Sequence, residues 1–148
     1  MGYGLPAAMG VQLARPGELV WAVVGDGGFQ MSAPELSTLA AGGIPLKVAV
    51  LNNRCLGMVR QWQESFYDGV LSESILPQPD IAALARAHGC LGLTVRTGGE
   101  LAGAIGAALD EPGPVVLDLQ VSVSETVLPM VPPGGALGDV ICYDGRPR

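Results

Sequence analysis

The sequence predicts an α/β fold: a three-layer domain in which a mostly parallel β-sheet is covered by helices on both faces. Two observations support this prediction. Short apolar runs of strand length recur along the chain, and stretches with helix start and stop signals separate them. Strands that alternate with helices form parallel sheets, because each helix carries the chain back across the sheet. The 148 residues are expected to form one domain with one ordinary core.

Four apolar runs are the candidate strands. They are continuous rather than alternating, which is typical of strands that are buried on both faces. Gly, Pro or polar residues bound them. The candidates span Leu19–Val24, Leu46–Leu51, Leu91–Val95 and Val115–Val121.

Capping signals predict the helices between these runs. Leu5–Leu13 is rich in Ala and Leu and is expected to be helical. Ser32-Ala33-Pro34-Glu35 fits a capping box for a helix that starts at Ser32 and runs to Ala41, before two glycines. The tail from Pro129 is expected to be irregular. The remaining helices are predicted over Leu56–Phe66, from an Asp80 cap to His88 with Gly89 beyond it, and over Gly99–Leu109 with Thr97 as the cap.

Composition excludes several classes of partner. Charged residues make up 15% of the chain, against about 25% in ordinary domains, and the net charge is −6. The low share of charge predicts that much of the surface faces other protein. No run of Lys or Arg suggests nucleic acid, and no apolar stretch approaches the roughly 20 residues of a membrane span. The widely spaced Cys55, Cys90 and Cys142 are expected to be reduced thiols of a cytoplasmic protein.

Polar clusters follow the first two candidate strands. Gly25–Phe29 follows the first strand and Asn52-Asn53 follows the second. One helix joins the two strands, so they are expected to be neighbours whose carboxyl ends meet. Asp26 and Asn53 would then converge on one point. Carboxylate and amide oxygens suit Mg²⁺, which leaves other positions to phosphate oxygens.

The glycines strengthen this interpretation. Gly27 and Gly28 let the backbone approach a phosphate closely, and the helix expected from Ser32 would add its positive dipole end. Either motif alone is more often a simple turn, but the two together favour a Mg²⁺-bridged diphosphate site. A mononucleotide-binding Rossmann unit is the weaker alternative, since GDGGF does not fit GxGxxG.

The order GDG, 24 residues, NN resembles the motif of the thiamine-diphosphate (ThDP) enzymes. The similarity extends over nearly the whole chain to the large subunit of acetolactate synthase (acetohydroxyacid synthase). MVRQWQ is the most discriminating part, because other ThDP enzymes share GDG…NN without it. The segments that carry this resemblance are MGYGLPAA at 1–8, LNNRCLGMVRQWQE at 51–64 and LPMVPPGGAL at 128–137.

The resemblance implies a role for individual residues. Met58 and Trp62 correspond to residues of the substrate channel, where Trp62 would shape the pocket for the second 2-keto acid. Their spacing also fits a helix face that packs into the core. The single histidine, His88, is expected to be structural. The implied metal ligands are Asp26, Asn53 and the backbone carbonyl of Cys55, and the implied cofactor contacts are Met1, Gly25, Asp26, Gly27, Gly28, Met31 and Asn53.

The implied reaction is that of a transferase and carboligase of branched-chain amino acid biosynthesis. Pyruvate is decarboxylated and the remaining fragment is joined to a second 2-keto acid, with the cofactor as electron sink. A catalytic Glu would come from a pyrimidine-binding domain, and no Glu of this chain matches it. We therefore expect residues 1–148 to be a C-terminal-type ThDP diphosphate and Mg²⁺ domain without the pyrimidine-binding and central domains.

Catalysis would then require a pyrimidine-binding domain or chain, in a homo- or hetero-oligomer, and FAD would require the central domain. A split enzyme, a fragment of a longer subunit and a decayed remnant all remain open as origins of the chain. Two other functions also remain open. One is another ThDP-dependent 2-keto acid decarboxylase, oxidase or carboligase, and the other is a non-catalytic ThDP-binding module.

Overall fold

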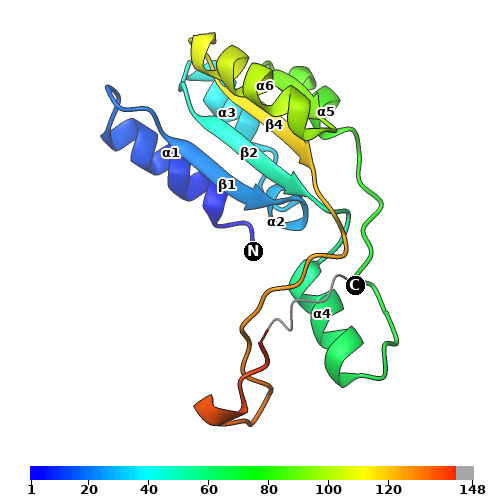
Figure 1. Cartoon of the computed structure of the whole chain (residues 1–148). Coiled ribbons are helices and arrows are strands. Elements are labelled where there is room, and N and C mark those ends of the chain that lie inside the picture. Colours follow the sequence, from blue (N-terminus) through cyan, green and yellow to red (C-terminus); the bar gives the residue numbers. More distant parts are fainter. Residues whose placement is uncertain (143–148) are drawn as a thin grey trace.

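The computed structural model of the chain describes residues 1–142, and residues 143–148, which end the tail expected from Pro129, lie outside the described part. A four-stranded parallel sheet with helices on both faces confirms the predicted α/β architecture (Figure 1). The elements are α1 (Gly4–Ala14), β1 (Trp21–Gly25), α2 (Asp26–Gln30), α3 (Glu35–Ala41), β2 (Lys47–Asn52), α4 (Gly57–Phe66), α5 (Ile81–Ala87), β3 (Leu91–Val95), α6 (Gly98–Asp110), β4 (Val115–Gln120) and the 3₁₀ turn η1 (Leu137–Asp139).

The order of the strands in the sheet is β1-β2-β4-β3, and all three pairs are parallel. The predicted adjacency of the first two strands is confirmed, with Gly25 opposite Leu51. Asn52 at the end of β2 lies opposite Gln120 of β4. The carboxyl ends of β1, β2 and β4 therefore meet at one edge, and we call this the carboxyl edge.

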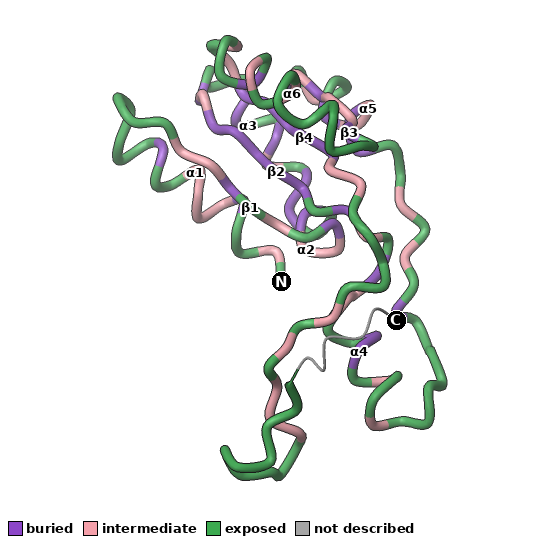
Figure 2. The backbone as a smooth tube through the Cα atoms, viewed as in Figure 1, coloured by how far each residue is buried: buried purple, intermediate pink, exposed green. Residues whose placement is uncertain are grey.

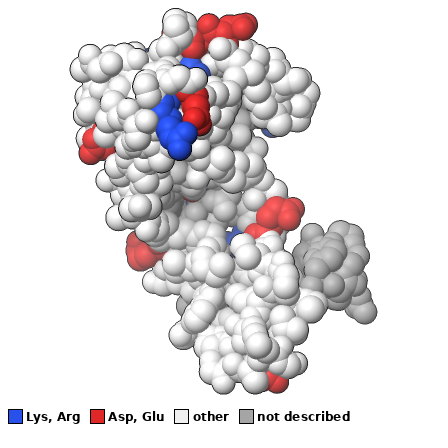
Figure 3. Space-filling view, turned by 90° about the vertical axis from the view of Figure 1, so that its left-hand side faces the viewer, with Lys and Arg blue, Asp and Glu red and all other residues white. Residues whose placement is uncertain are grey.

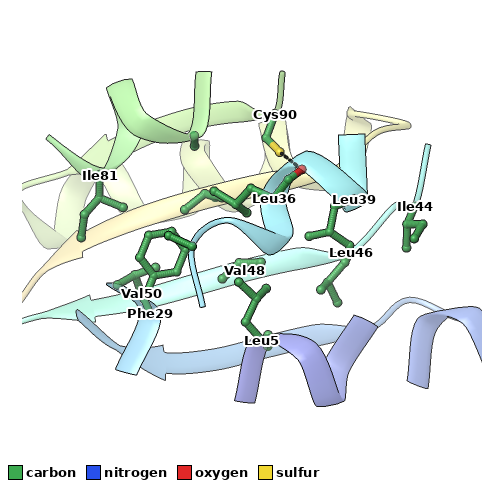
Figure 4. Close-up of a cluster of buried hydrophobic side chains, with 14 residues drawn as sticks. Leu5, Phe29, Leu36, Leu39, Ile44, Leu46, Val48, Val50, Ile81 and Cys90 are labelled. Carbon is green, nitrogen blue, oxygen red and sulfur yellow. Dashed lines mark hydrogen bonds between the residues drawn. The ribbon is translucent and has the colours of Figure 1, made fainter. Parts of the chain in front are cut away.

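One face of the sheet carries the main core. Side chains from α1, α2, α3 and α5 meet the strands there (Figure 4). Phe29, Leu36 and Leu39 are completely buried. Burial of each such side chain stabilises the fold by about 1.5–3 kcal/mol. Because Phe29 comes directly after the GDGG sequence, the start of α2 is fixed to the core.

The other face is only half covered. Helix α6 packs through Ala108 against Val115 and Leu117 of β4. Over β1 and β2, Val23 is 66% exposed and Leu51 is 42% exposed. Within the described residues, no helix covers this half of the face (Figure 1). The sequence pattern predicts burial on both faces, and within the described residues Val23 and Leu51 do not meet this prediction.

Helix α4 and the segment 121–130, which we call the C-terminal strap, lie beyond the carboxyl edge and are mostly exposed (Figure 2). Gln61 of α4 joins them: its Nε2 donates to the carbonyl of Val127 at 2.9 Å, and its Oε1 accepts the Val127 N–H at 2.8 Å. Gln63 binds the backbone of Ser72 with a similar pair at 2.8 and 3.3 Å. The two glutamines thus fasten α4 to two different segments.

Helix starts agree with the sequence except at one place. Asp80 and Thr97 are the N-cap residues of α5 and α6, as predicted, and the side chain of Asp80 accepts the Ala83 N–H at 2.8 Å. At α6 the Glu100 carboxylate also accepts the Thr97 N–H at 3.3 Å. The predicted start at Ser32 is wrong, because α3 begins at Glu35 without a side-chain cap. The N–H of Ser32 donates to the carbonyl of Phe29, so this serine belongs to the turn that follows α2.

In the described part of the chain, no helix has both the length and the apolar character needed to cross a membrane.

Candidate functional site

Asp26 stands at the end of β1 and begins α2, so the GDGG stretch is a short helix rather than an open loop. The helix that starts at this strand end is therefore α2, and not one from Ser32. The Asp26 carboxylate is buried; its Oδ1 accepts the Gly27 N–H at 2.9 Å and its Oδ2 accepts Nε2 of Gln78 at 2.7 Å. Gln30 donates in turn to Oε1 of Gln78. These contacts fix the orientation of the carboxylate.

Burial raises the pKa of Asp26 above its ordinary value, and the backbone N–H groups of Gly27 and Arg54 act in the opposite direction. Removal from water disfavours the charged form of a carboxylate, whereas a cation nearby favours it. Asp26 is therefore a buried carboxylate whose charged form a bound cation would stabilise.

The two glycines after Asp26 differ in the space available for a side chain. A Cβ on Gly27 would lie 2.7 Å from Cδ2 of Leu56 and 3.1 Å from Cδ1 of Leu76, so the ends of these two side chains would have to shift to admit it. A Cβ on Gly28 would have the Gly2 nitrogen as its nearest neighbour at 3.7 Å, which is ordinary contact. Gly27 thus lies in close contact with neighbouring side chains, whereas Gly28 is free of this steric constraint.

The turn after β2 is shaped by two asparagines. Oδ1 of Asn52 accepts the Arg54 N–H at 3.2 Å, and Oδ1 of Asn53 accepts the Cys55 N–H at 3.1 Å. Each is an Asx turn, in which a side chain binds the backbone two residues later. Arg54, which follows the two asparagines, adopts a φ of 58°. The two hydrogen bonds fix the backbone of residues 52–55.

The predicted metal ligands share one pocket. Asp26, Asn53 and Cys55 line a cavity of about 390 Å³ at the carboxyl edge. Sequence reasoning missed the other wall of this cavity, which the C-terminal strap supplies through Ser122, Glu125 and Thr126 among others. Only the strap's position after β4 hinted at this, because β4 ends at the same edge.

The predicted cofactor contacts form an adjoining pocket of about 430 Å³. Met1, Gly25, Gly27 and Gly28 line it together with Asp26 and Met58. Met31 is separated from them: it is 64% exposed and lines a different cavity of about 310 Å³ beside Gly27. The structure thus brings all of the predicted cofactor residues except Met31 into these two neighbouring pockets.

Met58 and Trp62 lie on α4 and are 47% and 37% exposed. They line a further cavity of about 370 Å³ with Val59, Gln63 and Tyr67. Trp62 contacts Phe66 edge to face, with ring centroids 5.7 Å apart. The alternative that these residues pack into the core is wrong, and their channel role stays a prediction.

Other candidate groups are structural. Nδ1 of His88 lies 2.7 Å from Oγ of Ser37, at the end of α5. Burial raises the pKa of the Cys55 thiol, which keeps this side chain neutral and leaves its backbone carbonyl as the available donor. Over residues 1–142, no group of three or more His, Cys, Asp or Glu side chains could hold a metal.

Three comparisons with known proteins agree on one family. Residues 1–119 match the family model described as thiamine pyrophosphate enzyme, C-terminal TPP binding domain. The acetolactate synthase large subunit of Pyropia yezoensis is 44% identical over 143 residues, which cover 95% of this chain and 24% of that protein. The acetolactate synthase isozyme 2 large subunit of Escherichia coli (strain K12) is 40% identical over 142 residues, 95% of this chain and 26% of that protein.

A solved structure has the same fold. It is the thiamine diphosphate-dependent 4-hydroxybenzoylformate decarboxylase of Rhodococcus jostii RHA1, with a TM-score of 0.80 and 30% sequence identity. The match covers 85% of this chain and 24% of the decarboxylase. The chain thus spans about a quarter of the length of the proteins that it matches.

Proposed function

The chain belongs to the thiamine pyrophosphate enzymes, as a C-terminal ThDP-binding domain of the acetolactate synthase-like kind, and we propose that it anchors ThDP through Mg²⁺ at its carboxyl edge. One observation carries this proposal: Asp26, Asn53 and Cys55, from the ends of two neighbouring parallel strands, line one pocket. Their oxygens are hard donors of the kind that Mg²⁺ prefers.

The donor set fits Mg²⁺ and a diphosphate. Asp26 offers a buried carboxylate whose charged form a cation would stabilise. Asn53 offers an amide oxygen that keeps a second lone pair beside its bond to Cys55. One carboxylate and two neutral oxygens leave positions that phosphate oxygens fill.

The proposed division of work follows from these positions. Asp26, Asn53 and the Cys55 carbonyl hold the cation, and the backbone at Gly25, Gly27 and Gly28 faces the diphosphate. When bound, ThDP supplies the electron sink for decarboxylation of a 2-keto acid. Met58 and Trp62 on α4 orient the second 2-keto acid and keep water from it.

We further propose that the complete enzyme is of the acetolactate synthase type, joins pyruvate to a second 2-keto acid and acts in branched-chain amino acid biosynthesis in the cytoplasm. The identities of 40–45% to acetolactate synthase large subunits support the proposed reaction. The alternative reaction is simple decarboxylation, which the likeness to the 4-hydroxybenzoylformate decarboxylase favours. Product analysis from pyruvate with a complete assembly separates them: acetolactate supports the first reaction and free acetaldehyde the second.

Catalysis is proposed to need a partner domain that supplies the missing Glu and covers the exposed apolar surface. Met1 and Tyr3 are 73% and 80% exposed, and Val23 and Leu51 lie on the half-covered sheet face. Uncharged residues make up most of the side of the molecule that carries α1 (Figure 3). Patches of this kind mark protein interfaces.

Calorimetry with ThDP and Mg²⁺ tests the anchor. We expect Mg²⁺-dependent ThDP binding to the chain and its loss in Asp26→Ala, because the only carboxylate of the donor set is then removed. Asp110→Ala, which changes an exposed acid at the end of α6, is the matched control and should bind as the wild type does. Retention of Mg²⁺-dependent binding by Asp26→Ala would overturn the assignment.

A further inference from the structure

A buried acid lies beside the metal-loop residues and has no part in the proposed site. Asp118 of β4 is 4% exposed. Its Oδ1 accepts Nδ2 of Asn52 at 2.8 Å and its Oδ2 accepts Nε2 of Gln120 at 2.8 Å. In the described part of the chain it forms no ion pair. A buried carboxylate without a cation is costly, and two amide donors offset only part of that cost.

The carboxylate decides which way the Asn52 amide faces. A charged carboxylate only accepts hydrogen bonds, so it selects the Nδ2 side of the amide. The Oδ1 side is thereby turned toward the Arg54 N–H, which it accepts at 3.2 Å. Asn52 is itself 2% exposed, so water does not compete for either end. A flipped amide would place donor against donor at Arg54.

The Arg54 backbone needs this support. Its φ of 58° lies in the left-handed region, which is unfavourable for a residue with a Cβ. The bond from Asn52 stabilises this conformation, and the bond from Cys55 N–H to Asn53 continues the turn. The Arg54 N–H also lowers the pKa of Asp26.

We propose that Asp118 is a positioning residue: it fixes the Asn52 amide, and through it the turn 52–55 that directs Asn53 and the Cys55 carbonyl at the metal pocket. What the turn binds rests on the function proposed above, whereas the control of its geometry does not. Outer partners of this kind change metal affinity by about 10–100-fold when they are removed.

Two measurements on the chain test this role. The first is hydrogen exchange of the Arg54 and Cys55 amides without metal. The second is the Mg²⁺ affinity at saturating ThDP. In Asp118→Leu we expect faster exchange at both amides relative to the amides of β2, and Mg²⁺ binding weakened about 10-fold or more. Asp118→Asn keeps a neutral acceptor for Asn52 and should recover most of both quantities.

Gln120→Leu is the matched control, because it removes the other donor to Asp118 and leaves the Asn52 contact in place. We expect wild-type exchange at Arg54 and wild-type Mg²⁺ affinity. If Asp118→Leu does not fold, Asp118→Ala takes its place, because it also removes the acceptor for Asn52. The proposal then requires faster exchange at Arg54 in Asp118→Ala than in Gln120→Leu.

Equal exchange at Arg54 in all folded variants would overturn the positioning role. Wild-type chain that binds no Mg²⁺ and ThDP would instead contradict the proposed function, and the exchange data would still decide the role of Asp118.

Discussion

The carboxyl edge and helix α4 line adjoining pockets, but they are built in opposite ways. At the edge, Asp26 and Asn52 are each 2% exposed and are held by hydrogen bonds to neighbouring elements. On α4, Met58 and Trp62 are 47% and 37% exposed, and the helix lies away from the sheet (Figures 1 and 2). The proposed metal end of the site is therefore held in place by contacts within the domain itself.

This difference separates the residues that should control cofactor binding and stability from those that should control substrate choice. Because the edge residues are fixed to the core, changes in the core should affect cofactor binding and stability together. Because α4 is held mainly by two glutamines, changes there should affect substrate choice with little effect on the domain.

The largest expected effect is on the core beneath the edge. Phe29→Ala should lower the free energy of unfolding by about 3–5 kcal/mol, because it removes a fully buried ring. It should also weaken ThDP binding, since Phe29 fixes α2 to the core. Urea denaturation measures the first effect and calorimetry the second. Met31→Ala, at a 64% exposed position of the next turn, is the control for the stability measurement. A loss below about 1 kcal/mol for Phe29→Ala would contradict this prediction.

A smaller effect is expected where α4 meets the strap. Gln61→Leu removes both hydrogen bonds to Val127, each of which contributes about 0.5–1.5 kcal/mol. Limited proteolysis and hydrogen exchange should therefore show faster opening of residues 121–130 and an unchanged core. Gln63→Leu removes the equivalent pair to Ser72 and should open that segment instead. Equal opening of the strap in both variants would show that Gln61 does not hold it.

Trp62→Ala separates substrate choice from stability. The side chain is partly exposed and its main aromatic partner is Phe66, so the expected loss is about 0.5–1.5 kcal/mol, the contribution of an edge-to-face pair. In a complete assembly, the ratio of products from competing 2-keto acids should change more than the rate with pyruvate alone. A stability loss as large as that of Phe29→Ala would place α4 in the core and remove the contrast.

The smallest effect is a pH dependence at the start of α6. The backbone N–H groups of Arg96 and Thr97 lower the pKa of Glu100 below its ordinary value. Because the pKa of Glu100 is lower in the folded state, its charged form stabilises the fold at pH values above the unfolded pKa, near 4.5. This stabilisation is lost as the pH falls through the folded pKa. Glu100→Gln should therefore lower the melting temperature slightly at pH 7 and converge with the wild type in acid. A constant difference across this range would assign the effect to shape instead of charge.

The adjacency of β1 and β2 was predicted correctly because consecutive parallel strands joined by one helix usually lie side by side. Asp26 and Asn53 follow two apolar runs joined by one helix, and such runs become neighbours whose ends meet. The caps at Asp80 and Thr97 act within three residues of their own positions, so local pattern was sufficient. The predicted helix start at Ser32 was wrong because the residue types of a capping box also occur in turns. The first helix after β1 is α2, which begins at Asp26.

The rest depends on contacts between distant residues. Gln78 meets Asp26 across 52 positions, and Asn52 meets Asp118 across 66. No local pattern distinguishes such a glutamine or aspartate from an ordinary polar residue. The apolar run of β1 predicts burial of Val23, but this burial needs a cover that the described residues do not supply.

The most direct test of the account is the place of the metal. Mn²⁺ takes the same oxygen ligands as Mg²⁺ and broadens the NMR signals of nearby nuclei. With ThDP and Mn²⁺ bound to the chain, the amides of residues 26–28 and 53–55 should broaden together, and those of α6 should stay sharp. Broadening that avoids either strand end, or that spreads over the exposed acids, would contradict the claim that these two ends hold the metal.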